Sequence, residues 1–238
     1  MRLRDGSGPR TPGISLSSRI LTPTQQRFLE AFFEDKGGTF YLSGGTALAA
    51  YYLNHRYSDD LDFFTRDQAE LAVTDRRVEH AVAAAGLSVE RVNRRAESVQ
   101  YFLSGDVEPD HPLVKCEFMF DPPPYFAPPR SFAGISVDDL ISIAINKLTI
   151  VTRIEWKDYF DRYLIEQSGK YRFEDLIAQA KQKLVGLDDF TLAAHFKAVE
   201  DLPNLAEFQK SYMLVKVDPR ELVSFFQEWA RRLFAIVG

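Results

Sequence analysis

Two short segments that lie close together in the chain constrain this protein more than any other feature of its sequence. Residues 40–48, Phe-Tyr-Leu-Ser-Gly-Gly-Thr-Ala-Leu, predict a buried strand that turns at Gly44 and Gly45 into a helix. The run Asp-Leu-Asp-Phe-Phe, which begins at Asp60, predicts a second strand. Asp60 and Asp62 then lie on the same face of it, because side chains alternate along a strand.

These segments supply two complementary kinds of ligand. A glycine turn at the start of a helix offers free backbone N–H groups to a phosphate, and the hydroxyls of Ser43 and Thr46 lie beside it. Two carboxylates on one strand face are suitable ligands for Mg²⁺. Together they indicate metal-assisted phosphoryl or nucleotidyl transfer.

A structural explanation exists for each segment. The two glycines are also typical of a plain strand-to-helix turn. The aspartates could also lie on the solvated face of an edge strand. In the metal-binding interpretation Asp59 is the residue that faces outward. In an otherwise apolar strand, however, two neighbouring carboxylates repel each other and are costly to bury. A divalent cation removes that conflict, so the metal-binding interpretation is favoured.

A third carboxylate is expected from a later strand, predicted over residues 112–120. Lys115 and Glu117 share one face of this strand, and the other face is apolar. Glu117 is the candidate third metal ligand, and Asp121 on the following loop is its rival. The sequence leaves this choice open.

Cations for a triphosphate are expected from the helices that follow. Lys147 lies in a predicted helix whose neighbouring residues are apolar, which indicates a largely buried position. Lys157 and Asp161 are spaced i and i+4 on the next helix, so they could form a surface ion pair. The alternative is that Lys147 or Lys157 neutralises phosphate charge, as phosphoryl transfer requires. His55 and Arg56 lie between the two motifs and are expected close to the substrate.

Bulk composition restricts the possible partners and locations. The net charge of −5 gives no general attraction to nucleic acid, so an RNA contact needs a local basic surface. The arginines expected to form that surface are Arg76, Arg77, Arg91, Arg94 and Arg95. A single cysteine excludes an internal disulfide and fits a reducing cytoplasm. No apolar run approaches 18 residues, so no membrane-spanning helix is expected.

The pattern along the chain predicts an α+β protein with three parts: a loose arm over 1–18, an α+β domain over 19–136 and a helical domain over 137–238. The predicted strands cover 39–43, 60–64, 87–95, 98–103, 112–120 and a short stretch near Ile135. The predicted helices cover 25–35, 46–54, 67–85, 138–152, 155–165, 173–184, 189–199 and 219–236.

The two motifs resemble those of the AbiEii/AbiGii-type toxins, which belong to the nucleotidyltransferase superfamily related in fold to DNA polymerase β. The resemblance covers about residues 40–165. It rests on the residues Ser43-Gly44-Gly45-Thr46-Ala47-Leu48, His55-Arg56-Tyr57-Ser58, Asp60-Leu61-Asp62-Phe63-Phe64, Lys115-Cys116-Glu117, Lys147, Arg153, Lys157-Asp158 and Asp161.

The resemblance implies a small mixed β-sheet flanked by helices, followed by an α-helical C-terminal region. It also implies Mg²⁺ as cofactor and a nucleoside triphosphate (NTP) as substrate. Glu117 stands where the family often has Asp. In relatives the nucleotide goes onto RNA, notably the acceptor end of tRNA, and the toxin is paired with an antitoxin protein.

The function expected from these observations is transfer of a nucleoside monophosphate (NMP) from an NTP to an RNA hydroxyl by a cytoplasmic toxin. The alternatives are transfer to a protein hydroxyl, or a non-catalytic module that binds NTP or a partner. The predicted catalytic residues are Asp60, Asp62, Glu117, Lys147 and Asp161, and the first three are the predicted metal ligands. The predicted nucleotide-binding residues are Ser43, Gly44, Gly45, Thr46, Arg56, Ser58 and Lys157.

Overall fold

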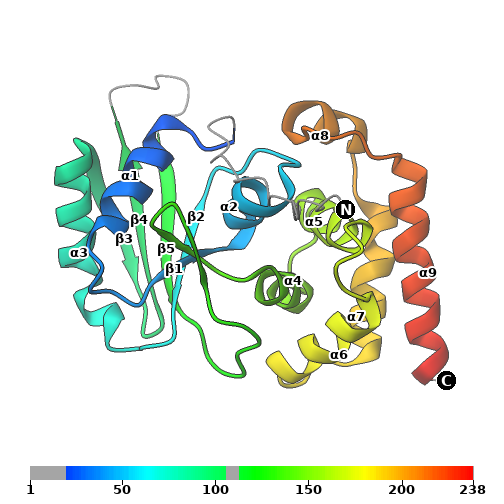
Figure 1. The fold of residues 1–238 in the computed structure, drawn as a ribbon. Coiled ribbons are helices and arrows are strands. Elements are labelled where there is room, and N and C mark those ends of the chain that lie inside the picture. Colours follow the sequence, from blue (N-terminus) through cyan, green and yellow to red (C-terminus); the bar gives the residue numbers. More distant parts are fainter. Residues whose placement is uncertain (1–19, 106–112, 238) are drawn as a thin grey trace, which may run out of the picture.

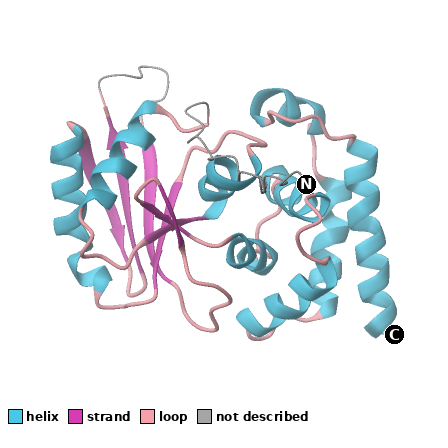
Figure 2. Cartoon of the chain, viewed as in Figure 1, coloured by secondary structure: helices cyan, strands magenta, loops and turns pink. Residues whose placement is uncertain are grey.

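The computed structural model describes residues 20–105 and 113–237 of the chain, so the predicted arm over 1–18 lies outside the described residues. The described part contains a seven-stranded mixed sheet with helices on both sides (Figures 1 and 2). This confirms the predicted α+β class with a mixed sheet flanked by helices. In spatial order the strands are β3 (Ser88–Arg94), β4 (Ser98–Ser104), β5 (Val114–Phe120), β2 (Leu61–Thr65), β1 (Tyr41–Ser43), β7 (Ile135–Val137) and β6 (Arg130–Phe132).

The centre of the sheet is built from β2, which runs antiparallel to β1 and parallel to β5. Phe63 and Phe118 lie opposite each other in the β2–β5 register, and their rings stack at 4.5 Å between centroids. Phe28 and Phe32 from the first helix, α1 (Pro23–Glu34), pack against the same cluster. Because side chains alternate, Asp62 on β2 must then face the opposite side of the sheet.

Two helices cover the aromatic face of the sheet, and they appear at the left of Figure 1: α1 and α3 (Glu70–Ala85). A capping box between Thr22 and Gln25 starts α1. Gly86 ends α3 in a left-handed conformation with φ 61°.

The bend between the two motifs is helical, as predicted. α2 (Gly44–Ala47) continues directly into a π-helical segment, η1 (Leu48–Leu53), which ends at Asn54 with φ 51°. Ala47, Leu48 and Ala49 in this stretch are fully buried. The predicted strands and helices are otherwise present, with ends shifted by up to three residues.

The rest of the chain forms a helical region at the right of Figure 1. It contains α4 (Leu140–Thr149), α5 (Trp156–Gln167), α6 (Phe173–Lys183), α7 (Asp189–Lys197), the 3₁₀ turn η2 (Ala198–Asp201), α8 (Leu205–Tyr212) and α9 (Pro219–Val237). α8 was not predicted, because it has no fully buried residue and no side chain caps its start at Asn204. None of the helices in the described ranges is long and apolar enough to cross a membrane.

Candidate active site

A cavity of about 450 Å³ lies between the polar face of the sheet and the helical region. Most of the predicted site residues meet there, although they come from segments more than 100 positions apart. Those that line it are Ser43, Gly44, Gly45, Arg56, Ser58, Asp60, Asp62, Glu117, Lys147 and Lys157. The cavity therefore brings predicted acids, cations and the glycine bend to one place.

The acidic wall of the cavity is formed by the sheet. Asp62 lies directly opposite Glu117 in the parallel β2–β5 register, and Asp60 immediately precedes β2. Lys115 lies among these acids, with its Nζ 3.3 Å from Asp60 and 3.9 Å from Glu117. The expectation that Asp60 and Asp62 share one face, together with Lys115 and Glu117, agrees with this geometry.

The electrostatics of this wall favour a bound cation. Burial raises the pKa of the Asp62 carboxyl above its ordinary value, and the nearby Asp60 raises it further. Within the described ranges, no group of three or more His, Cys, Asp or Glu side chains is already arranged to hold a metal ion. The donor set nevertheless suits Mg²⁺, because carboxylate oxygens are its preferred ligands and a cation would relieve the repulsion.

The glycine bend permits close approach of charged side chains. Gly44 has φ 68°, and a Cβ there would collide with the Asp62 carboxylate. A Cβ at Gly45 would collide with the Arg56 guanidinium. Gly44 is therefore required by packing and by backbone conformation, and Gly45 is required by packing alone.

Thr46 does not line the cavity, which corrects its predicted role in nucleotide binding. Its side chain is fully buried, and its hydroxyl donates a hydrogen bond to the backbone carbonyl of Asp60. It therefore ties the helix after the glycine bend to the residue that begins the acidic wall.

Ser43 is held by a residue that the sequence did not single out. Its Oγ donates to the Asp138 carboxylate at 2.8 Å, and the Asp138 backbone N–H donates to the Leu42 carbonyl. Burial raises the pKa of Asp138 to about 7. The only sequence signal was its place between the short strand near Ile135 and the helix α4, which begins at Leu140.

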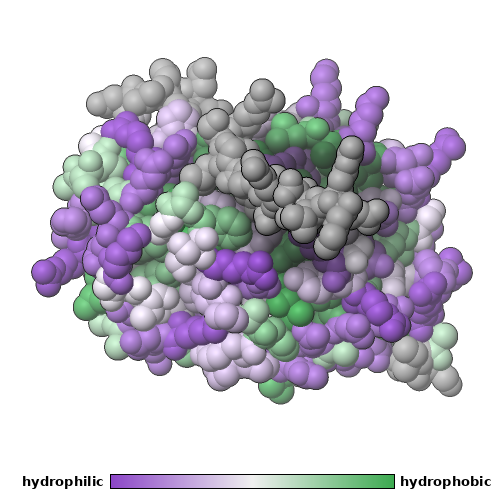
Figure 3. All heavy atoms as spheres, in the orientation of Figure 1, coloured by the Kyte–Doolittle hydropathy of each residue, from purple (hydrophilic) through white to green (hydrophobic). Residues whose placement is uncertain are grey.

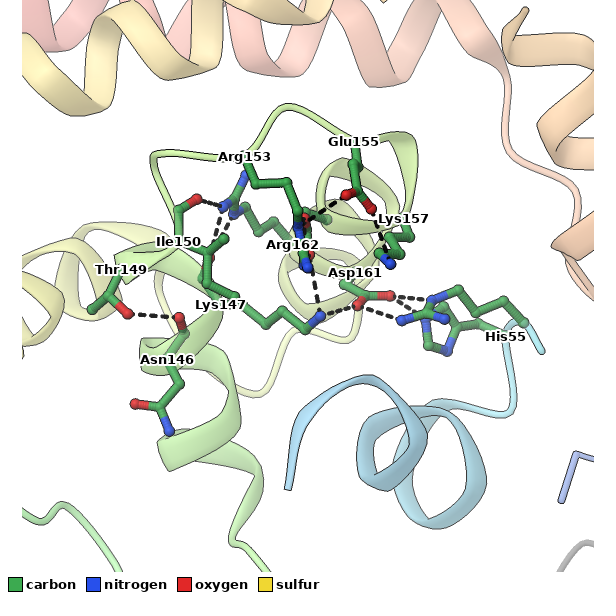
Figure 4. A network of polar contacts seen from close by, with 12 residues as sticks. His55, Asn146, Lys147, Thr149, Ile150, Arg153, Glu155, Lys157, Asp161 and Arg162 are labelled. Atoms are coloured by element: carbon green, nitrogen blue, oxygen red, sulfur yellow. Dashed lines mark hydrogen bonds and ion pairs between the residues drawn. The ribbon is translucent and has the colours of Figure 1, made fainter. Parts of the chain in front are cut away.

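Asp161 is the centre of a buried ion-pair network behind the cavity (Figure 4). Arg56 donates two hydrogen bonds to its carboxylate, at 2.7 and 2.8 Å, and Lys147 Nζ lies 2.7 Å from it. Although burial acts to raise the pKa of Asp161, Arg56 and Lys147 hold it well below its usual range. Asp161 does not line the cavity, whereas Arg56 and Lys147, which it holds, both line it; its catalytic role stays a prediction.

His55 belongs to the same network and does not contact the cavity. Its side chain is buried, with Nε2 2.7 Å from Asp161. Burial lowers the pKa of the imidazole. The expectation that it lies close to the substrate is therefore wrong, because it supports Asp161 from behind.

The cations of the helical wall are fixed by α5. Asp158 accepts two hydrogen bonds from Arg153 at 2.9 Å, and Lys147 Nζ lies 3.3 Å from it. Lys157 pairs with Glu155 at 2.9 Å, so the predicted i,i+4 pair of Lys157 with Asp161 is wrong. Asp161 points inward to bind Lys147, whereas Lys157 remains at the cavity surface.

Further lining residues were missing from the predictions. Asn146 on α4 and Lys183 at the end of α6 both line the cavity. Lys183 pairs with Asp121 at 2.6 Å, and Asp121 also accepts a hydrogen bond from Tyr41 at 2.5 Å. Asp121, the rival third carboxylate, thus already has two partners. No sequence pattern indicated Lys183, because it looks like a surface lysine at a helix end.

The predicted basic surface lies away from the cavity. Arg91 and Arg94 are on the edge strand β3, which β4 and β5 separate from β2. Both pair with Asp75, at 2.9 and 2.7 Å. These pairs reduce the positive potential that the arginines offer to RNA, and binding there stays a prediction.

Comparison with known proteins identifies the fold. The structure resembles JHP933 from Helicobacter pylori, with a TM-score of 0.58 and 18% identity over 92% of this chain and 93% of that chain. It also resembles MenT4, a nucleotidyltransferase toxin from Mycobacterium tuberculosis, with a TM-score of 0.50 and 13% identity over 89% and 82% of the two chains. No protein with curated annotation matches the sequence.

The fold and the cavity define a nucleotidyltransferase. Residues 27–216 match the family described as "Nucleotidyl transferase AbiEii toxin, Type IV TA system". The chain belongs to this AbiEii nucleotidyltransferase toxin family, which confirms the resemblance seen in the sequence motifs.

Proposed function

We propose that this protein transfers NMP from an NTP to an RNA hydroxyl, at the 3′ end of tRNA, in a Mg²⁺-dependent reaction in the cytoplasm. One observation carries the proposal. A single cavity has carboxylates on its sheet wall and cations on its helical wall, so a metal–triphosphate complex would meet opposite charge on both sides. The type IV toxin–antitoxin assignment of the family supports a cognate antitoxin as partner.

Asp60 and Asp62 would hold the metal, with Glu117 as the third carboxylate. Glu117 lies next to Asp62 across the strand pair, whereas Asp121 is occupied by Tyr41 and Lys183. When bound, Mg²⁺ supplies a Lewis acid that offsets charge developing on the transferred phosphoryl group.

The triphosphate would lie between the glycine bend and the helical wall. The bend allows backbone atoms to approach the phosphates, since neither Gly44 nor Gly45 carries a side chain. Lys147 and Arg153, fixed by Asp158, would neutralise phosphate charge without first having to be ordered. Lys157 at the cavity surface would add a third cation.

The proposed reaction is an in-line displacement. The acceptor oxygen forms a bond to the α-phosphorus, the bond from that phosphorus to the β-phosphate bridging oxygen breaks, and pyrophosphate leaves. Glu117 takes the proton of the acceptor hydroxyl. Its side chain is 29% exposed and faces the cavity, so a substrate can reach it.

The test is incubation of the protein with each labelled NTP, Mg²⁺ and total RNA, followed by separation of RNA from protein. Label on the tRNA fraction, lost on chelation and restored by Mg²⁺, is the expected result. Label on protein alone would favour the protein acceptor. NTP binding without any labelled product would favour the non-catalytic module.

A further inference from the structure

A second cavity opens beside the candidate active site. Its volume is about 440 Å³, and it shares Arg56, Ser58, Asp60 and Lys157 with the first cavity. Because the two cavities share these residues, a ligand in the second one lies next to the acidic wall of the first. None of the functions assigned above uses this space.

Aromatic rings form much of its wall: Tyr57, Trp156, Phe208 and Tyr212. The Trp156 indole N–H donates to the Pro203 carbonyl at 2.5 Å, which fixes that ring. Phe208 and Tyr212 stack with centroids 5.1 Å apart. Tyr57 and Tyr212 are 44% and 43% exposed, so these two rings remain open to a ligand.

The wall is built jointly by both halves of the chain. The Tyr57 N–H donates to the Tyr212 carbonyl at 2.9 Å, and the Leu214 N–H donates to the His55 carbonyl at 2.8 Å. These bonds attach the end of α8 to the loop that carries Arg56 and Ser58. Figure 3 shows apolar residues at the surface in the region where Figure 1 places α8.

The charges of the second cavity differ from those of the first. Asp59, Asp60 and Glu155 line it, and its two cations are already paired, Arg56 with Asp161 and Lys157 with Glu155. Such a wall repels phosphate, but its carboxylates can accept hydrogen bonds from the amino groups of a nucleobase. Flat aromatic rings beside acceptor groups therefore suit a planar, uncharged ring that bears N–H donors.

We propose that the second cavity holds the terminal nucleobase of the RNA acceptor, stacked on Tyr57 and Tyr212, so that its ribose hydroxyl reaches the acidic wall. This inference rests on the function proposed above. Unstacked bases at RNA ends are commonly recognised by aromatic side chains. The base of the NTP is assigned to the first cavity, where the apolar residues Phe64, Ile143 and Ile150 lie beside Lys147.

The first experiment compares steady-state labelling of RNA by the wild type and by Tyr212→Ala. The KM for RNA is expected to rise by about 5- to 100-fold, the loss typical of one base–aromatic stack, with the KM for NTP unchanged. Tyr212→Phe keeps the ring, so its KM for RNA is expected to lie much closer to the wild-type value than that of Tyr212→Ala. Phe190→Ala removes another exposed ring, 58% exposed on α7, and serves as the control.

The possible outcomes distinguish a failure of this inference from a failure of the proposed function on which it rests. If the wild type labels RNA and Tyr212→Ala has an unchanged KM for RNA, the inference is wrong and the proposed function stands. If only the KM for NTP rises, the cavity holds the NTP base instead. If the wild type labels only protein, or labels nothing, the proposed RNA acceptor is wrong and this inference is wrong as well.

A binding measurement supports the test without relying on turnover. The chain has two tryptophans, so Trp229→Phe leaves Trp156 as the only one. A short single-stranded RNA with a free 3′ hydroxyl should quench Trp156 fluorescence, and a blunt RNA duplex should not. Equal quenching by both RNAs, or none at concentrations that support labelling, contradicts the proposal.

Discussion

Lys147 and Asp161 form a buried ion pair at 2.7 Å, and only one of the two residues reaches the candidate active site. Lys147 lines the cavity, whereas Asp161 lies behind it and also binds Arg56. Because Asp161 belongs to α5, the packing of that helix determines where the Lys147 cation lies in the site.

Removing the Asp161 carboxylate should destabilise the whole protein. Asp161→Ala leaves Arg56 and Lys147 buried without their counter-charge, and breaking such a pair costs about 3–5 kcal/mol. Urea unfolding followed by circular dichroism measures this loss. Glu228→Ala on α9 is the control, since its ion pairs with Arg231 and Arg232 are exposed and their loss should change stability little. Equal losses in the two variants would contradict the buried network.

Replacing Asp62 by Asn should separate activity from stability. We expect nucleotidyl transfer to fall by about a hundredfold or more, because a metal ligand is lost. We expect the thermal midpoint without metal to stay the same or rise, because the fold disfavours the charged form of Asp62.

The control for this substitution is Asp175→Asn, on an exposed carboxylate in the first turn of α6 that lines neither cavity. Activity of Asp62→Asn at the level of Asp175→Asn would remove Asp62 from the site. Both variants are assayed by labelled-NTP incorporation and by thermal melts.

Asp138 should make folding stability depend on pH. Its pKa is about 7 in the folded protein against an ordinary value of 3.8, so between these values the folded state retains a proton that the unfolded chain has released. Stability should therefore fall as pH rises from about 4 to 7, by up to about 4 kcal/mol, since tenfold in proton affinity corresponds to about 1.4 kcal/mol. Asp138→Asn should remove this loss.

The measurement is urea unfolding across this pH range for the wild type and Asp138→Asn, with the difference between the two curves isolating Asp138. A constant difference at all pH values would show that Asp138 does not titrate as described. Asn keeps an acceptor oxygen for Ser43, so the substitution does not itself remove that hydrogen bond.

Asn146 should influence which NTP is used. Its side chain lines the cavity one residue before Lys147, and Figure 4 shows its amide pointing away from the ion-pair network. An amide can donate and accept hydrogen bonds, so it can distinguish nucleobases by about 1–3 kcal/mol. Asn146→Ala should reduce the preference among the four NTPs by about tenfold or more. Competition between labelled NTPs measures the preference, with exposed Asn93→Ala as control; an unchanged preference would contradict the role.

The strand patterns were readable from the sequence because alternation is a local property. Asp62 and Glu117 were placed on the polar face by their apolar neighbours alone, and the structure pairs them across adjacent strands. The glycine bend was readable for the same reason. What the sequence could not give was the partner of each charge.

The errors concern contacts between distant segments. The shared helix allows an ion pair between Asp161 and Lys157, but the actual partners of Asp161 come from another helix and from the loop before β2. The sequence did not single out Asp138 because its hydrogen-bond partner, Ser43, lies 95 positions away. α8 was missed because it is only eight residues long, has no buried residue and has no side-chain cap at Asn204.

The ion pair between Arg56 and Asp161 restricts how the sequence of this protein can evolve. The two residues come from opposite sides of the proposed domain boundary near position 136, yet they are parts of one interior. Neither half can be replaced by that of a distant relative unless the remaining half carries the opposite charge that the new half needs at this ion pair. The two halves should accordingly evolve together. A substitution on one side of the ion pair should be accepted only where the other side has already changed to match it.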